Sequence, residues 1–179
     1  ILDTGMPGLE QSKPFRKMGI HSSPTGELFL QDVKVGPERL LGETEEVSAR
    51  SGAKDTFSSE RSGVAAMALG IVERCLALSV QYSKERVQFG QPIGQFQLIQ
   101  AKLAAMEIAR MNLQNMVYRY IELSAKGQKP TLAEASAMKL YAAKTAVDVA
   151  LEAVQIHGGN GDMAEYHVEQ LARDAKILQ

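Results

Sequence analysis

Apolar residues recur every three or four positions through most of the chain after residue 57, which is the period of an amphipathic helix. The pattern predicts four helices, at about 58–86, 95–126, 131–157 and 163–179. Gly127 is a candidate C-cap of the second helix, and Thr131 with Glu134 has the form of a capping box for the third. Four apolar-striped helices joined by short connections favour an antiparallel four-helix bundle.

We interpret the apolar stripes as bundle core and not as a cofactor-binding surface, because such residues at helical spacing usually face a core. The stripe predicted for the first helix consists of Val64, Met67, Ile71, Cys75, Leu78 and Tyr82. In the third helix the stripe is rich in alanine, which lets this helix approach its neighbours closely.

The first 42 residues have a different pattern, with short apolar runs between glycines and prolines. Residues 26–35 alternate Leu28, Leu30, Val33 and Val35, which is typical of a half-buried strand. Two or three strands bury too little surface to be stable alone. We therefore expect these strands to complete a β-domain that begins upstream, and interpret the chain as part of a longer protein.

Charge and composition narrow the function classes. The 20 basic and 21 acidic residues are interspersed, which argues against nucleic acid or an anionic membrane surface as the main partner. No uninterrupted apolar stretch is long enough for a membrane span, so none is expected. The single cysteine, Cys75, excludes an internal disulfide and a cysteine-based zinc site, and its apolar neighbours predict a buried, inert thiol. His21, His157 and His167 lack metal-ligand spacing, and no metal site is expected.

Residues 83–97, SKERVQFGQPIGQFQ, interrupt the helical pattern with glycine and proline and bring cationic and amide side chains to the break. The planar, permanently charged guanidinium of Arg86 is suited to pyrophosphate oxygens, and a solvated charge beside Glu85 is the alternative. Gln97 can donate and accept hydrogen bonds, as a ribityl or adenosine group requires, or it is a surface amide.

Several segments resemble acyl-CoA dehydrogenases, and their order and spacing make the resemblance specific. SKERVQFGQPIGQFQ, AVQIHGGNG (153–161) and EQLARDAKILQ (169–179) resemble the C-terminal domain of that family. KMGIHSSPTGELFLQDVKV (17–35) and RLLGE (39–43) resemble the end of its middle β-domain. The resemblance implies that residues 1–45 are the incomplete end of a β-barrel-like domain. Residues 46–179 would then be the helical bundle domain, truncated at its C-terminus.

The resemblance also implies FAD, which lies between these two domains and is also held by the bundle of a second subunit, usually within a homotetramer built as a dimer of dimers. The residues implied in cofactor binding are Arg86, Phe89, Gln97, Gln155, Ile156, His157, Gly158 and Gly159. From the residues alone, the glycine pair is equally a helix C-cap and His157 a capping or partly exposed histidine.

In this family a carboxylate removes the α-proton of an acyl-CoA thioester while a hydride leaves the β-carbon for the flavin. Most members place this base three residues beyond Gln179. A subgroup that includes isovaleryl- and long-chain-type enzymes places it near the start of the first bundle helix, where FSSERSG has Glu60. We favour Glu60 as the base, with Ser58, Ser59 and Arg61 on the substrate side. The alternative is a carboxylate at a helix N-terminus, with Ser58 and Ser59 as N-caps.

The expected function is therefore α,β-dehydrogenation of an acyl-CoA, with electrons passed to electron-transfer flavoprotein, in the bacterial cytoplasm or the mitochondrial matrix. The alternatives are an acyl-CoA oxidase of the same fold and a non-catalytic helical interaction module. Two departures from the family pattern are Asp162, where an aromatic residue is usual, and Val35-Gly36-Pro37 at the strand end. A carboxylate at position 162 would be costly if that position were buried.

Overall fold

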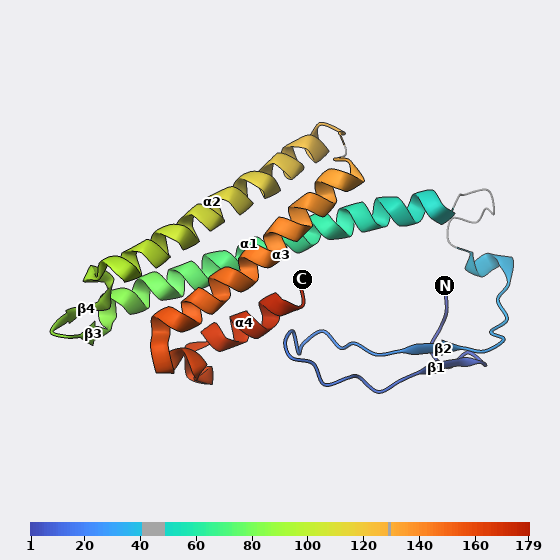
Figure 1. Cartoon of the computed structure of the whole chain (residues 1–179). Helices are drawn as coiled ribbons and strands as arrows, with labels where there is room; N and C mark the ends of the chain where they lie inside the picture. Colours follow the sequence, from blue (N-terminus) through green and yellow to red (C-terminus); the bar gives the residue numbers. More distant parts are fainter. Residues whose placement is uncertain (41–48, 129) are drawn as a thin grey trace.

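The chain forms a helical bundle with a two-stranded ribbon on its N-terminal side (Figure 1). The computed structural model describes residues 1–40, 49–128 and 130–179, with the backbone alone for 49–55. The helices are α1 (Ala49–Glu85), α2 (Gln97–Ala125), α3 (Leu132–His157) and α4 (Val168–Lys176). The strands are β1 (Leu9–Gln11), β2 (Leu28–Leu30), β3 (Val87–Gln88) and β4 (Gln91–Pro92). Short 3₁₀ helices are η1 (Pro37–Arg39), η2 (Ile93–Gln95), η3 (Gly158–Asp162) and η4 (Ala164–Tyr166).

Helices α1, α2 and α3 run side by side in alternating directions, and α4 packs along α3 (Figure 1). The predicted mainly α architecture with four helices is confirmed. The β-barrel-like part is not confirmed, because the described N-terminal residues form a single antiparallel pair in which Leu9 faces Leu30.

Helix α1 begins at Ala49, so its predicted start near residue 58 was wrong. Glu60 therefore lies about three turns inside the helix, and Ser58 and Ser59 are not N-caps. The Ser62 hydroxyl donates instead to the Ser58 carbonyl oxygen at 3.0 Å, as serine does inside helices. The interpretation of Glu60 as a helix N-terminal carboxylate is thus excluded.

The face of α1 that is most deeply buried consists mostly of small residues and overlaps the predicted stripe only at Cys75, while Val64, Ile71, Leu78 and Tyr82 of that stripe are partly buried and pack against the core. The buried residues of this face are Ser62, Ala65, Ala68, Val72, Cys75, Ser79 and Ser83. Met67, which was predicted in the stripe, is 52% exposed. The reason is the partner helix, because α3 presents alanines that let the two backbones come close. These α3 residues are Ala142, Ala143, Ala146, Ala150 and Ala153.

The ends of α2 and α3 follow their sequence signals. The Gly127 N–H donates to the Ser124 carbonyl and the Gln128 N–H to the Leu123 carbonyl, a Schellman arrangement that gives Gly127 a φ of 70°. At the start of α3, the Thr131 hydroxyl accepts from the Glu134 N–H while the Glu134 carboxylate accepts from the Thr131 N–H. The predicted capping box is confirmed.

Helix α4 begins at Val168 and not near residue 163, so that boundary was also wrong. Residues 164–166 form η4, and His167 has a φ of 61°, a left-handed conformation that ends η4 before α4 begins. The side chain of Asp162 is exposed, which removes the cost of a buried carboxylate at that position.

The N-terminal ribbon is docked on α4 by a short segment around Gly19. The Ile20 N–H donates to Asp174 Oδ1 at 2.6 Å, and Arg173 Nη1 donates to the Met18 carbonyl at 2.8 Å. A Cβ at Gly19 would lie 2.5 Å from the Arg173 carbonyl oxygen, so this close approach requires glycine.

The predicted half-buried strand over 26–35 is reduced to Leu28–Leu30, and all three of its residues are exposed. A two-stranded ribbon has no second layer to cover either face, which explains this exposure. The predicted boundary between residues 45 and 46, and most of RLLGE, lie outside the described residues.

By length and composition, α1 residues Thr56–Glu85 could cross a membrane, since an 18-residue window has a mean hydropathy of 1.7. The core helix of a soluble protein passes the same test, but such a helix is mostly buried, whereas 28% of this window is buried. The expectation of no membrane span therefore stays a prediction.

Candidate functional site

A β-hairpin lies between α1 and α2, at the end of the bundle where α3 ends (Figure 1). Its two-residue turn is Phe89-Gly90, with φ values of 53° and 80°. Positive φ at both central residues is what a type I′ hairpin turn requires, and glycine is favourable there while phenylalanine is not. Phe89 is 93% exposed, so the described residues provide no burial that would offset this conformation.

The hairpin, the start of α2 and the end of α3 border an open hollow of about 650 Å³. Three predicted cofactor residues, Phe89, Gln97 and Ile156, line this hollow, although they come from three segments of the chain. Phe96 lies edge-on to Phe89 with ring centres 6.2 Å apart. The hollow therefore combines flat aromatic surface with the exposed amide of Gln97.

Arg86 follows the last residue of α1 and is exposed. Within the described part of the chain its guanidinium has no hydrogen-bond or ion-pair partner. Glu85 accepts a hydrogen bond from Gln81 Nε2 at 3.0 Å, and the exposed Arg86 side chain agrees equally with the alternative of a solvated charge at the helix end. The Arg86 backbone is fixed, because its N–H donates to the Tyr82 carbonyl and its own carbonyl accepts from the Ile93 N–H, both at 2.8 Å. A fixed backbone with a free guanidinium is suited to an anionic ligand.

The glycines after α3 have separate roles. Gly158 has a φ of 60° and its N–H donates to the Gln155 carbonyl, which ends the helix. Gly161 is buried, and a Cβ there would lie 2.3 Å from the Val154 carbonyl oxygen, so packing requires this glycine. A Cβ at Gly159 would meet no protein atom within 4 Å, and its φ is not positive. Packing within the chain therefore does not explain glycine at position 159.

His157 is buried at the end of α3, and Gln155, two residues earlier, is exposed. His157 Nδ1 lies 2.8 Å from the Ala153 carbonyl oxygen, and the neutral imidazole donates this hydrogen bond. Desolvation lowers the pKa of His157, while the hydrogen bond to Ala153 raises it. His157 is thus a packed, neutral side chain, and the alternative of a capping or partly exposed histidine was wrong.

Sequence reasoning missed Tyr82, whose ring stacks on His157 with centres 4.2 Å apart. It also missed Asn160, whose amide donates to the hydroxyls of Tyr82 and Tyr166, each at 3.0 Å. The one available signal was that Tyr82 precedes Arg86 by a single helical turn.

The predicted substrate-side residues lie elsewhere on α1. Glu60 and Ser59 are exposed, and Ser58 and Arg61 are half-buried. Glu60 has no hydrogen-bond or ion-pair partner among the residues whose side chains are described. Along a continuous helix the separation between Glu60 and Arg86 is about 40 Å. One chain therefore does not bring Glu60 and Arg86 to the same reacting atoms.

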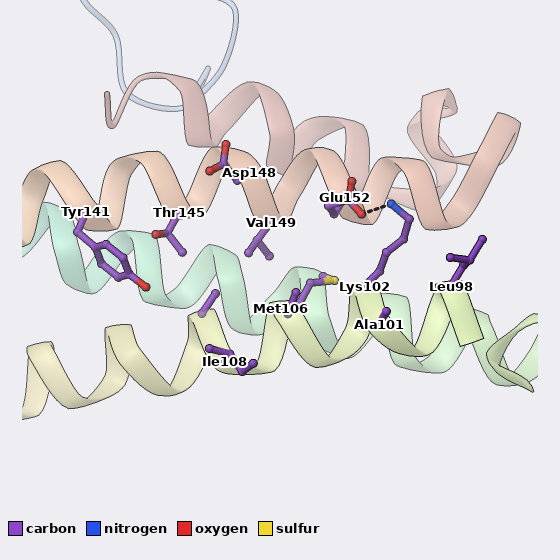
Figure 2. A pocket seen from close by; sticks show the side chains of 12 residues that line it. Leu98, Ala101, Lys102, Met106, Ile108, Tyr141, Thr145, Asp148, Val149 and Glu152 are labelled. Atoms are coloured by element: carbon purple, nitrogen blue, oxygen red, sulfur yellow. Dashed lines mark hydrogen bonds and ion pairs between the residues drawn. The ribbon is translucent and has the colours of Figure 1, made fainter. Parts of the chain in front are cut away.

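A second hollow, also of about 650 Å³, lies between α2 and α3 and is shown in Figure 2. It is lined mainly by apolar side chains, and an ion pair between Lys102 and Glu152 crosses it. None of the predicted site residues lines this hollow. Among the described residues, no group of three or more His, Cys, Asp or Glu side chains is placed to hold a metal ion.

A long antiparallel helical bundle is the architecture that the resemblance to acyl-CoA dehydrogenases implies for residues 46–179. Residues 51–179 match the family model described as acyl-CoA dehydrogenase, C-terminal domain. The chain belongs to the acyl-CoA dehydrogenase family.

Similar proteins agree with this assignment. The chain is 47% identical over its whole length to a short-chain specific acyl-CoA dehydrogenase of Megasphaera elsdenii and spans 46% of that protein. The structure of butyryl-CoA dehydrogenase from M. elsdenii superimposes with a TM-score of 0.91 at 47% identity, over 99% of this chain and 46% of that one. The structure of an acyl-CoA dehydrogenase from Bacillus anthracis in complex with FAD superimposes with a TM-score of 0.89 at 32% identity. The match covers 99% of this chain and 33% of that one. The chain thus spans about half the length of the curated relatives it matches.

Proposed function

We propose that the protein containing this chain is an FAD-dependent acyl-CoA dehydrogenase that passes electrons to electron-transfer flavoprotein. The observation that carries this proposal is the end of the bundle where the hollow, the free guanidinium of Arg86 and Gly159 lie. A dinucleotide requires flat apolar surface, a cation for its pyrophosphate and close backbone approach. The aromatic lining of the hollow, the guanidinium of Arg86 and the open position at Gly159 support the proposal on these three points.

In this proposal Arg86 binds pyrophosphate oxygens, and Phe89, Gln97 and Ile156 bind the adenosine side. Residues 155–159 contribute backbone and the open position at Gly159, where a Cβ would occupy space meant for the ligand. FAD, when bound, supplies the acceptor for the hydride that leaves the β-carbon of the substrate.

Glu60 is the proposed general base for the α-proton. Its carboxylate is available, because it has no partner within the described side chains, and a rigid helix fixes its backbone. Enclosure by the substrate and the rest of the protein would desolvate the carboxylate and make it more basic. Arg61, together with Ser58 and Ser59, would contact the substrate on the same stretch of α1.

The separation of about 40 Å between Glu60 and Arg86 supports a shared cofactor arrangement. Each chain would contribute Glu60 to one active site and Arg86 to the cofactor of another, within the homotetramer. The exposed apolar side chains of α2, which include Leu98, Ile108 and Ile121, are available for subunit contacts.

The direct test is anaerobic stopped-flow reduction of the purified full-length protein by acyl-CoA. Butyryl-CoA is the first probe, because the M. elsdenii structure is described as a butyryl-CoA dehydrogenase. Wild-type protein should bleach the flavin band, and electron-transfer flavoprotein should restore it faster than air. Fast recovery in air would favour an oxidase, and a colourless protein that binds no FAD would favour an interaction module.

Glu60→Gln should slow this reduction about 10²–10⁴-fold with FAD still bound. The matched control is Glu73→Gln, an exposed carboxylate on the same helix, which should reduce at the wild-type rate. Unchanged reduction in Glu60→Gln would assign the base to the position three residues beyond Gln179.

A further inference from the structure

A cluster of four side chains joins the end of α1 to the turn that follows α3. The Tyr82 hydroxyl donates to the His157 carbonyl oxygen at 3.2 Å and accepts from Asn160 Nδ2 at 3.0 Å. The second amide hydrogen of Asn160 donates to the Tyr166 hydroxyl, also at 3.0 Å. One tyrosine hydroxyl therefore holds both sides of the Gly158–Gly159 turn.

The rings of the cluster are packed as well as hydrogen-bonded. Tyr82 stacks on His157 at an interplanar angle of 24°, and Tyr166 lies edge-on to Tyr82 with centres 5.9 Å apart. His157 Nδ1 is itself bound to the Ala153 carbonyl, so the imidazole is fixed by its own helix. The packed rings of Tyr82, His157 and Tyr166 thus hold the residues on both sides of the Gly158–Gly159 turn in fixed positions.

The cluster connects two segments that the cofactor proposal needs together. The Tyr82 carbonyl accepts the Arg86 N–H at 2.8 Å, which fixes the backbone that carries the guanidinium. The Tyr82 hydroxyl fixes the backbone on either side of Gly158 and Gly159. Neither glycine has a side chain that could anchor the turn, and a Cβ at either position would meet no protein atom within 4 Å.

We propose that Tyr82 and Asn160 are positioning residues that hold Arg86 and the Gly158–Gly159 turn at the spacing one dinucleotide requires. This inference rests on the proposed binding of FAD. It assigns to Tyr82 a role in cofactor affinity in addition to packing. Neither residue needs to contact the cofactor for this role.

The test is the affinity of FAD-free full-length protein for FAD, measured by flavin fluorescence during titration. A net hydrogen bond of ordinary strength corresponds to about a fivefold change in an equilibrium constant. Tyr82→Phe keeps the ring and removes two hydrogen bonds, so the dissociation constant for FAD should rise about 5- to 25-fold. Asn160→Ala should have an effect of the same size. Tyr118→Phe, which changes an exposed tyrosine on α2, should have none.

Two further measurements separate positioning from simple packing. The dissociation constant for FAD of the double variant Tyr82→Phe/Asn160→Ala should be at most about twofold above that of the single variant that binds FAD less tightly. The reason is that both changes break one network. Thermal unfolding of the FAD-free proteins reports packing alone. Tyr166→Phe removes one of the two hydroxyl groups that accept hydrogen bonds from Asn160. Because Tyr166 is 38% exposed, this change should weaken FAD binding less than Tyr82→Phe does.

The outcomes are distinct. Wild-type protein that binds no FAD would overturn the proposed function and this inference together. Wild-type binding with an unchanged dissociation constant in Tyr82→Phe and Asn160→Ala would overturn the inference alone. A lowered melting temperature with unchanged FAD affinity would assign the cluster a purely structural role. Additive effects in the double variant would also overturn it, because the two residues would then act separately.

Discussion

Gly161 lies directly against the backbone of Val154, and an added Cβ would come within 2.3 Å of the Val154 carbonyl oxygen and 3.0 Å of its Cα. This contact folds the chain back onto α3 immediately after the Gly158–Gly159 turn. The glycines at 159 and 161 therefore meet different constraints, although they belong to the same short motif.

The first prediction uses this difference. Gly161→Ala should destabilise the protein by about 1–3 kcal/mol, as overpacking does, because the backbone of Val154 cannot move aside. Gly159→Ala should leave the melting temperature of the FAD-free protein unchanged or slightly raised. It should nevertheless weaken FAD binding, since only a ligand would occupy the space beside it. Differential scanning fluorimetry and FAD titration of both variants would check this, and normal FAD affinity in Gly159→Ala would contradict it.

The second prediction concerns His157 and acid. Desolvation lowers the pKa of this imidazole in the folded protein. Below the ordinary value of about 6.5 the unfolded chain therefore binds a proton before the folded one does. The contribution of His157 to stability is present above this value, decreases as the pH falls, and stops changing below the folded pKa.

Urea unfolding between about pH 7 and pH 5 should show this loss in the wild type and a smaller loss in His157→Gln. The control is His167→Asn, because His167 is exposed and asparagine tolerates its φ of 61°. His167→Asn should keep the wild-type pH dependence. An equal acid loss in His157→Gln and the wild type would refute the assignment.

The third prediction concerns Cys75. It is fully buried in α1, and burial raises the pKa of its thiol to about 12. The reactive thiolate is therefore almost absent at neutral pH, and iodoacetamide cannot reach the sulfur. Peptide mass spectrometry should find Cys75 unmodified after labelling of the folded protein and fully modified after labelling in denaturant. Modification under native conditions would show that α1 opens locally.

The parts of the fold that were predictable from sequence are those that carry local signals. Thr131 and Glu134 marked the start of α3, and Gly158 marked its end, because caps and left-handed glycines act through neighbouring residues. The start of α1 was predicted from the first apolar residues at helical spacing, and that prediction was wrong by about nine residues. The stripe predicted for α1 was only partly right, since periodicity favours large apolar residues while close helix packing selects small ones.

The candidate site was predictable only where one short segment carries it. Residues 83–97 and 155–159 were each identified, and the structure brings Phe89, Gln97 and Ile156 to one hollow. The Tyr82–His157 contact spans 75 positions in the sequence, and nothing local in the pattern indicates it. Hydrogen bonds between distant residues depend on how helices pack, which periodicity alone does not determine.

The alanine-lined contact between α1 and α3 also limits how the protein can diverge. Ala65 and Ala68 are fully buried opposite alanines of α3, so nearly every substitution there would add volume to a closed interface. Glycine and serine are the residues whose volume is small enough to replace alanine at these two positions. Ala66 and Met67 on the same helix are exposed, and residues of this kind are free to change. The fold should therefore tolerate substitutions on the outer faces of α1 more readily than substitutions at Ala65 or Ala68.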